Sequence, residues 1–442
     1  MPIVPQASSP PCGIISFAIP QGPPSCQHGN HLPAGGTIGE LFRDYGEEYI
    51  QVYSANRRTI ELIRSIRVCR TSALGGKRIT CRGCGQVRYQ YMSCGNSQCP
   101  QCQGIKRLQW QDRLRCRMLQ VPYCHITFTL PHDLNGLARR NPWQVYNLMF
   151  HSAWQTVRRL CKKAKDVGGL PGMSAVLHTW GSDLKYHVHL HCLVTFGGYN
   201  EQDGRWHWPK RKRKIAPYRK LSGKYRGIFL KRLKKLMESG QVDYHQSYEE
   251  LESSLPKKRW VVNHQWPTAE TKVIEEYLGR YICRIGISDK RLSYDKNGQN
   301  VCIEYNNYRE QKAGQPAPKA CRHMEPLAAM HQILQHQLPP YFQRSRHYGL
   351  HAAPTYKRLK GRLPSIVKQE GATVRTVVQI LRALLQEEPY CCEACSGTDF
   401  QEEHLAPDPA YTRYHVLGRA QRSPPMRAQR APAGTSASPQ TC

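Results

Sequence analysis

Apolar residues recur at helical spacing in two stretches of the chain. Between Ile38 and Arg67 they follow one another at intervals of three or four, with charged residues between them, which is the pattern of a helix with one apolar face. Helices are therefore predicted there, ahead of a cysteine-rich segment. A second stretch from Trp143 to Lys163 predicts another helix.

Three segments between Tyr123 and Tyr199 have the apolar, aromatic and β-branched composition of β-strands. They read "CHITFTL", "SAVLHTW" and "HVHLHCLVTF". Because the predicted helix of residues 143–163 lies among them, we predict an α+β core for this part of the chain. A further helical segment is expected after Pro267.

The chain of 442 residues exceeds the usual size of a single hydrophobic core, so at least two folded units and tails are expected. Residues 1–36 are rich in Pro, Gly and Ser and contain no Lys or Arg, which predicts a disordered lead-in without a secretion signal. The sequence contains no run of about 18 apolar residues, which argues against a membrane span. Residues 406–442 are rich in Pro, Ala, Arg and Ser, which predicts a disordered basic tail.

The charge balance points to a polyanionic partner. The chain has 64 Lys and Arg against 32 Asp and Glu, a formal net charge of +32, and cations of this number favour binding to the phosphates of DNA or RNA. The segment from Trp206 to Lys235 is the most basic and contains aromatic residues on which bases could stack. Its run of Lys210, Arg211, Lys212, Arg213 and Lys214 is the predicted DNA contact, the alternative being a solvated loop.

Nineteen cysteines without an export signal favour bound metal over disulfides. Two Cys-x-x-Cys pairs, Cys81 with Cys84 and Cys99 with Cys102, have the spacing of a structural zinc site with four thiolate ligands. We predict this set, with Cys94 or Cys69 as a substitute or as part of a second site. A later group of Cys391, Cys392 and Cys395 offers half of such a site, and is interpreted as structural or incidental.

Three histidines alternate along the third predicted strand. Because strand side chains alternate between faces, His187, His189 and His191 project from the same face. Three alternating imidazoles predict a cation site, since each would otherwise need a buried partner. Magnesium or manganese suits a catalytic ion that accepts phosphate oxygens, and imidazole also suits zinc. If residues 176–191 form a hairpin, His178 lies opposite this strand and is the first candidate for a third ligand; His187 and His125 are the alternatives.

Tyr277 and Tyr281 stand four residues apart in the helix predicted after Pro267, so their hydroxyls share one helical face. Spacing alone favours core packing, because apolar neighbours complete a stripe on that face. Chemistry favours a second role: a nearby cation orients a phosphate and stabilises the charge that develops during attack by a phenol oxygen. The expected product is a tyrosine joined to a 5′ phosphate, with a free 3′ hydroxyl.

Several motifs occur in the order of a known family: "SCGNSQCPQC", "PYCHITFTLPHDL", "LHTWGSDLKYHVHLHCLVTFGG", "YLGRYICRIGIS" and "LPPYFQRSRHYGL". From about Ile38 to Ala353 the chain resembles the two-tyrosine rolling-circle transposases of the insertion sequence 91 family, within the HUH (His-hydrophobic-His) endonucleases. The resemblance implies an antiparallel sheet with helices, preceded by a small zinc-binding module. It also implies that His189 and His191 are metal ligands and that Tyr277 and Tyr281 are nucleophiles.

The family's activity implies cofactors, partners and a domain order. Structural zinc, catalytic Mg²⁺ or Mn²⁺, single-stranded element ends and target DNA are expected, with no membrane partner and a cytoplasmic, nucleoid-associated location in a bacterium. The predicted divisions are a lead-in at 1–36, a helical, zinc-binding and DNA-binding module at 37–120, a catalytic domain at 121–355, a C-terminal helical segment with cysteines at 356–405 and the tail at 406–442.

The chain departs from the family pattern at several positions. Val188 replaces a common proline between two histidines, and Ser97 and Gln98 stand where Arg and His are usual. Two alternatives compete with transposition. A plasmid relaxase or replication initiator would use the same chemistry, and a non-enzymatic, zinc-stabilised DNA-binding protein would need only the charge and the cysteines.

Overall fold

The computed structural model describes residues 36–211, 214–255, 260–265, 267–268, 286–295, 297, 299–308, 310–312, 314–367, 373–385 and 391–407. These residues form helices and antiparallel sheets, which confirms the predicted α+β class. None of the helices in these ranges is long and apolar enough to cross a membrane.

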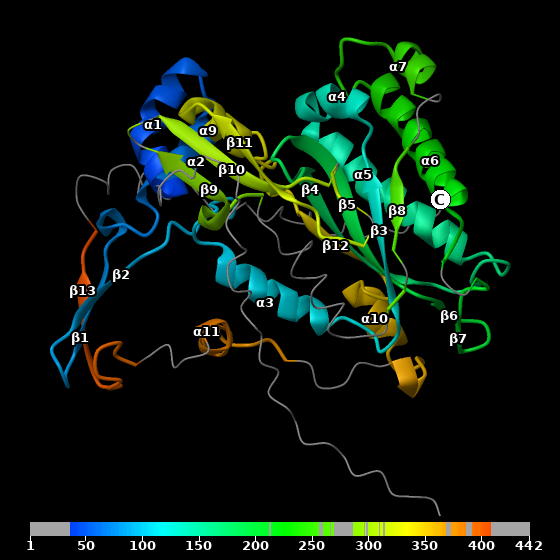
Figure 1. Ribbon diagram of the computed structural model, residues 1–442. Coiled ribbons are helices and arrows are strands. Elements are labelled where there is room, and N and C mark those ends of the chain that lie inside the picture. Colours follow the sequence, from blue (N-terminus) through cyan, green and yellow to red (C-terminus); the bar gives the residue numbers. More distant parts are fainter. Residues whose placement is uncertain are drawn as a thin grey trace, which may run out of the picture.

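A five-stranded sheet in the order β12-β4-β5-β3-β8 forms the centre of the fold (Figure 1). Every neighbouring pair in it is antiparallel. The three predicted strands are β3, β4 and β5. The bounds are β3 Tyr123–Thr129, β4 Gly172–Trp180, β5 Tyr186–Thr195, β8 Val262–His264 and β12 Ser345–Gly349.

Helices cover one face of this sheet. Val188, Leu190 and Cys192 of β5 are buried on that face together with apolar residues of α5 and α6. The helix predicted from Trp143 to Lys163 is α5, which has Pro142 in its first turn and ends at Cys161, two residues before the predicted end. Four helices form this layer: α4 Asn135–Arg140, α5 Pro142–Cys161, α6 Tyr218–Glu238 and α7 Tyr248–Ser254.

The opposite face of the sheet is only partly apolar. Near one end, Tyr123, Val176 and Leu193 pack against α3 (Gly104–Arg115), α10 (Ala353–Leu359) and the loops that follow them. Further along the same strands the side chains become histidines. On this face, apolar packing therefore covers one end of the sheet, and histidines line the other end.

The N-terminal helices share a second core with a segment far along the chain. Ile38, Leu41 and Ile63 are buried together with Val301 and Met330, so packing crosses the predicted boundary between residues 120 and 121. Thr37 starts the first helix with a capping box that involves Glu40. The elements are α1 Ile38–Val52, α2 Arg57–Val68, β9 Leu292–Asp295, β10 Asn300–Asn306, β11 Lys319–Met324 and α9 Pro326–Leu334.

A small three-stranded sheet joins the two ends of the described chain. In Figure 1, β13 near the red end of the colour bar lies beside the blue strands β1 and β2, in the order β13-β1-β2. The remaining elements are β1 Gly76–Cys81, β2 Val87–Tyr91, β6 Gly198–Asn200, β7 Arg205–His207, α11 Val377–Leu385, β13 Phe400–Leu405 and the short 3-10 turns Ser72–Leu74, His132–Leu134, Asp289–Arg291 and Ser365–Val367.

Candidate functional site

The strand register brings three histidines together. His178 of β4 lies directly opposite His189 of β5, and His191 lies on the same face because strand side chains alternate. The imidazole nitrogens of these three residues all lie within 4.8 Å of one another. His178, the first candidate for a third ligand, therefore lies with His189 and His191. His187 lies outside this group, and its ring lies beside that of His132.

The three imidazoles are buried and hold defined orientations. His178, His189 and His191 are 3%, 9% and 6% exposed. The Nδ1 atom of His189 lies 2.9 Å from the carbonyl oxygen of His187. Because a carbonyl only accepts hydrogen bonds, Nδ1 carries the proton, and the lone pair on Nε2 points toward His191 Nε2 at 3.0 Å. This is the tautomer that a metal ligand needs.

A fourth histidine lies behind His191. The Nε2 atom of His125 is 3.0 Å from His191 Nδ1, and the hydroxyl of Thr127 is 2.9 Å from the same His125 nitrogen. A hydrogen bond at Nδ1 fixes the ring of His191 and leaves its Nε2 facing His189. His125, which the sequence offered as an alternative ligand, is therefore placed to orient a ligand.

Burial keeps the rings of His125, His189 and His191 neutral near pH 7. Desolvation lowers the pKa values of His125 and His189 from 6.5 to about 3 and lowers the pKa of His191 well below 6.5. Neighbouring histidines and Arg344 lower the pKa values of His189 and His191 further. Neutral imidazoles are the form that binds metal, so the electrostatics favour coordination.

Arg344 is a residue of this site that the sequence reasoning missed. Its guanidinium carbon lies 4.8 Å from the centre of the Trp180 ring, and Trp180 stacks on His178 at 4.8 Å with an interplanar angle of 16°. The Nε atom of Arg344 donates to the carbonyl of Leu177 at 3.0 Å. A fixed cation therefore stands beside the histidines, where it can contact a phosphate. Arg344 lies in the motif "LPPYFQRSRHYGL". The sequence pattern assigned no functional residue to this motif.

Tyr277 and Tyr281 lie outside the described residues. The flanking positions are described: Thr268 pairs with Tyr123 of β3, and a Cβ atom placed on Gly286 would lie 3.2 Å from the Trp180 ring. The chain therefore leaves the central sheet before the tyrosine segment and returns beside the ring that covers His178.

The predicted zinc site of Cys81, Cys84, Cys99 and Cys102 does not form as one cluster. The structure divides these cysteines between two groups of four, because the hairpin of β1 and β2 carries the first pair away from the second. Cys99 and Cys102 meet Cys69 and Cys94, the two residues that the sequence kept as substitutes, and Cys81 and Cys84 meet Cys392 and Cys395. Gln98, one of the positions that depart from the pattern implied by the resemblance, accepts a hydrogen bond from the backbone nitrogen of Leu338 at 2.7 Å.

The predicted DNA-contact run is described at Lys210, Arg211 and Lys214, while Lys212 and Arg213 lie outside the described residues. Arg211 lies 3.3 Å from the buried carboxylate of Asp166. Asp166 is also the single acid among the described residues that line a neighbouring cleft of about 750 Å³ between α5 and α6.

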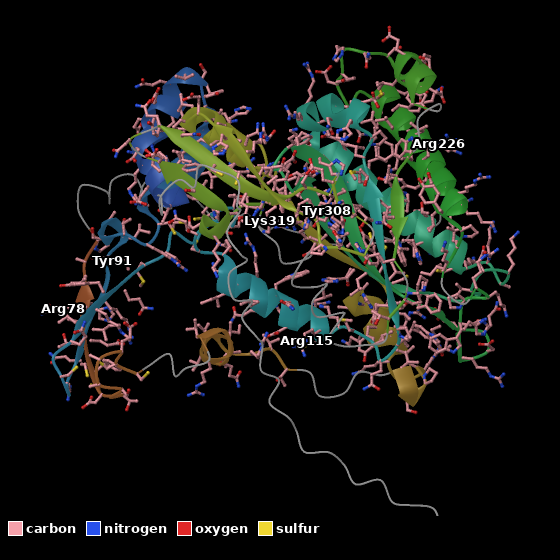
Figure 2. All side chains as sticks on the ribbon, in the orientation of Figure 1. Arg78, Tyr91, Arg115, Arg226, Tyr308 and Lys319 are labelled. Atoms are coloured by element: carbon pink, nitrogen blue, oxygen red, sulfur yellow. The ribbon has the colours of Figure 1, made fainter. Side chains whose placement is uncertain are left out.

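This cleft, called here the basic groove, is strongly cationic. Nine of its described lining residues are Lys or Arg, and none is Phe, Tyr or Trp. Figure 2 shows the basic side chains along α6, the helix that carries the labelled Arg226. Because α5 and α6 pack on the face of the sheet that carries Val188, the basic groove lies on the opposite side from the histidines. Its cationic lining residues are Arg159, Lys163, Lys165, Arg219, Lys220, Lys224, Lys231, Arg232 and Lys235.

Comparisons with known proteins identify the family. A family model described as "Transposase zinc-binding domain" matches residues 41–130, and one described as "Putative transposase" matches residues 172–358. A protein of Sinorhizobium fredii named "Putative transposase y4qJ" is 32% identical over 326 residues, which cover 72% of this chain and 80% of the relative. The chain belongs to the insertion sequence 91 family of transposases.

A second relative of this transposase is the transposase for insertion sequence element IS801 of Pseudomonas savastanoi pv. phaseolicola. It is 26% identical over 359 residues, which cover 76% of this chain and 82% of the relative. No solved structure matches the transposase. The matches confirm the resemblance inferred from the motifs, and the zinc-binding domain at residues 41–130 contains one complete four-cysteine group, Cys69, Cys94, Cys99 and Cys102.

Proposed function

We propose that this transposase nicks and rejoins single-stranded DNA by metal-dependent tyrosine transesterification, and that it mobilises its insertion sequence by rolling-circle transposition. The observation that carries the proposal is the convergence of His178, His189 and His191, whose ring nitrogens lie within 4.8 Å of one another on one strand face. DNA at the element ends and at the target is the proposed substrate, and association with the bacterial nucleoid follows from it.

The donor set fits a divalent cation. His178, His189 and His191 would hold the ion, and three imidazoles leave coordination positions for phosphate oxygens. When bound, Mg²⁺ or Mn²⁺ supplies positive charge that polarises the scissile phosphate. Arg344, fixed over Trp180, adds a second cation that can neutralise the charge gained by the phosphate oxygens during attack.

Tyr277 and Tyr281 are the proposed nucleophiles. The oxygen of one tyrosine attacks phosphorus, the bond from phosphorus to the 3′ oxygen breaks, the phenol loses its proton and the departing 3′ oxygen gains one. The 5′ phosphate stays joined to the tyrosine, so the energy of the broken ester is kept for rejoining. The return of the chain at Gly286 beside Trp180 supports a tyrosine segment near the histidines.

Single-stranded oligonucleotides carrying an element end test this proposal in the presence of Mn²⁺. The wild-type protein is expected to give a protein–DNA adduct that survives denaturation, and Tyr277→Phe with Tyr281→Phe is expected to give none while it still binds the oligonucleotide. His189→Ala should also prevent nicking. A wild-type protein that binds the strand and never forms the adduct would instead be the zinc-stabilised binding protein.

A plasmid relaxase or replication initiator would give the same adduct, so the adduct alone does not establish transposition. Both matched family models carry transposase descriptions, which favours transposition. Mobilisation of a marked element from a donor plasmid separates these functions, because a relaxase or initiator acts on its own plasmid origin and does not insert the element at a new target.

A second proposal concerns the DNA that is not being cut. The basic groove offers phosphate-binding cations and, among its described lining residues, no Phe, Tyr or Trp on which unpaired bases could stack. Lys220 to Lys235 span about 22 Å along α6, which is the axial length of about six base pairs. We propose that duplex DNA away from the nicked strand binds the basic groove, on the side of the sheet opposite to the histidines.

A further inference from the structure

Two pairs of cysteines from opposite ends of the described chain meet in the small sheet of β1, β2 and β13. The sulfur of Cys81 lies 3.6 Å from that of Cys395, which is 314 residues further along the chain. The sulfur of Cys84 lies 3.5 Å from that of Cys392. All four sulfurs lie within 4.8 Å of one another. The matched zinc-binding domain ends at residue 130, so it contains one pair and not the other.

These separations match a tetrahedral metal site. Four sulfurs at about 2.3 Å from one zinc ion are about 3.8 Å from each other, whereas a disulfide joins sulfurs at about 2.05 Å. The observed distances of 3.5 and 3.6 Å therefore belong to four separate ligands gathered around one point. Four thiolates in this arrangement select zinc among the common divalent ions.

Both pairs lie in the same kind of turn. The backbone nitrogen of Gly85 donates to the carbonyl of Cys81 at 2.9 Å, and that of Ser396 donates to the carbonyl of Cys392 at 2.7 Å. The residue after the second cysteine is left-handed in each turn, with φ of 74° at Gly85 and 56° at Ser396. A serine adopts this conformation at a cost that its surroundings must offset. The repeated geometry is that of two knuckles that present their thiols to one ion.

The strands beside the knuckles are complementary in charge and hold them in register. Cys81 pairs with Phe400 at one end of the antiparallel β1–β13 ladder. Lys77 lies 2.5 Å from Glu402, and Arg78 lies 3.4 Å from Glu403. Figure 2 labels Arg78 and Tyr91 on the hairpin that β13 joins.

The two outer strands of this sheet are largely exposed, and only the central strand β1 has buried residues. The four middle residues of β13 are exposed, as are the last three of β2. A module with so little apolar burial usually needs a metal or a disulfide for stability. Exposed ion pairs such as those of Lys77 and Arg78 each contribute little, so a bound ion would add substantially to the stability of this sheet.

We propose that Cys81, Cys84, Cys392 and Cys395 bind a second structural zinc ion, distinct from the one held by Cys69, Cys94, Cys99 and Cys102. Each thiol loses its proton as the ion binds. The ion fastens the C-terminal segment to the N-terminal module, so the three-stranded sheet depends on both ends of the chain. This site does not rest on the proposed nuclease activity.

Zinc content of the purified full-length protein tests the proposal. By elemental analysis, Cys392→Ser with Cys395→Ser is expected to contain one tightly bound zinc ion fewer than the wild-type chain, a difference that zinc on the three histidines does not change. Cys391→Ser is the matched control, since it changes a neighbouring cysteine outside the group of four and should keep both ions. Equal zinc contents in the wild-type chain and the double variant, or iron in place of zinc in the wild-type chain, would overturn the assignment.

Two further measurements separate loss of this site from general misfolding. After cobalt replaces zinc, the thiolate-to-cobalt absorbance of the double variant should fall to about half of the wild-type value, because one tetrathiolate site remains. Limited proteolysis should release the β13 segment from the double variant and leave it attached in Cys391→Ser. Nicking of a single-stranded oligonucleotide is assayed in parallel, so that failure of the nuclease proposal is seen independently of the zinc count.

Discussion

Charge removal in the basic groove gives the sharpest test of how this transposase holds duplex DNA. Lys163, Lys231 and Lys235 are exposed and line this groove, so their replacement by Gln removes three of its nine cations. Lysine and glutamine have similar helix propensities. The change should therefore alter binding and leave the fold intact, which thermal unfolding followed by circular dichroism can verify.

The size of the effect follows from counterion release. Each phosphate neutralised by a cation contributes about 0.9 to the slope of log K against log salt concentration. If each of the three lysines contacts one phosphate, the slope should become shallower by about 2.7. Over a fourfold rise in salt, the affinity of the variant should then fall roughly 40-fold less than that of the wild-type protein.

Fluorescence anisotropy with a labelled duplex, measured between 50 and 200 mM salt, gives both slopes. The matched control replaces Lys290, Lys357 and Lys360, which are exposed and lie outside the basic groove, with Gln, so it changes the net charge equally. The reasoning is refuted if the groove variant keeps the wild-type slope, or if the control lowers the slope as much. A larger change for a single-stranded probe than for the duplex would reassign the groove to unpaired DNA.

Three further predictions concern the histidine face. His125→Ala should weaken Mn²⁺ binding by 10- to 100-fold, because it removes the hydrogen bond that orients His191. Calorimetric titration measures the Mn²⁺ affinity, and an unchanged affinity would contradict the orienting role of His125. Arg344→Gln should lower the nicking rate about a hundredfold with little change in Mn²⁺ affinity, whereas a normal single-turnover rate would exclude it from the reaction. His351 is buried with its pKa lowered from 6.5 to about 3, so the unfolded chain binds more protons in this interval and stability falls as the pH drops from about 6.5 toward 3. Urea unfolding at pH 7.5, 6 and 5 should show that the free energy of unfolding depends less steeply on pH in His351→Gln than in the wild-type protein, by at most about 1.4 kcal/mol per pH unit. If the free energies of both proteins change equally with pH, His351 does not cause the loss of stability at low pH.

Local patterns in the sequence determined the elements of the fold. Alternation along a strand depends only on backbone geometry, so His189 and His191 were placed on one face from the sequence. Helix α5 likewise followed from the pattern of residues 143–163, although it ends at Cys161. His178 was also accessible, because β4 and β5 are joined by a short connection and a hairpin sets its own register. The assigned roles of these histidines and of the tyrosines remain proposals.

The cysteine groups show what local spacing leaves open. A Cys-x-x-Cys pair specifies half of a tetrahedral site, and the partner pair is chosen by the chain's path through space. The sequence paired Cys81 and Cys84 with their nearest neighbours, whereas β13 brings Cys392 and Cys395 to them through the ladder with β1. Only the tertiary structure contains that contact, because strand pairing over more than 300 residues leaves no periodic signal in either segment.

The same limit applies to charge and to Arg344. Sequence composition predicted a nucleic-acid partner, but the basic groove exists only because α5 and α6 pack side by side on the sheet and align their outward faces. Arg344 reaches the histidines because its segment lies against β4. Backbone periodicity and spacing are properties of neighbouring residues, and the sequence therefore determined the elements and the kinds of chemistry. Which elements meet depends on burying apolar faces across the whole chain, and only the tertiary structure decided it.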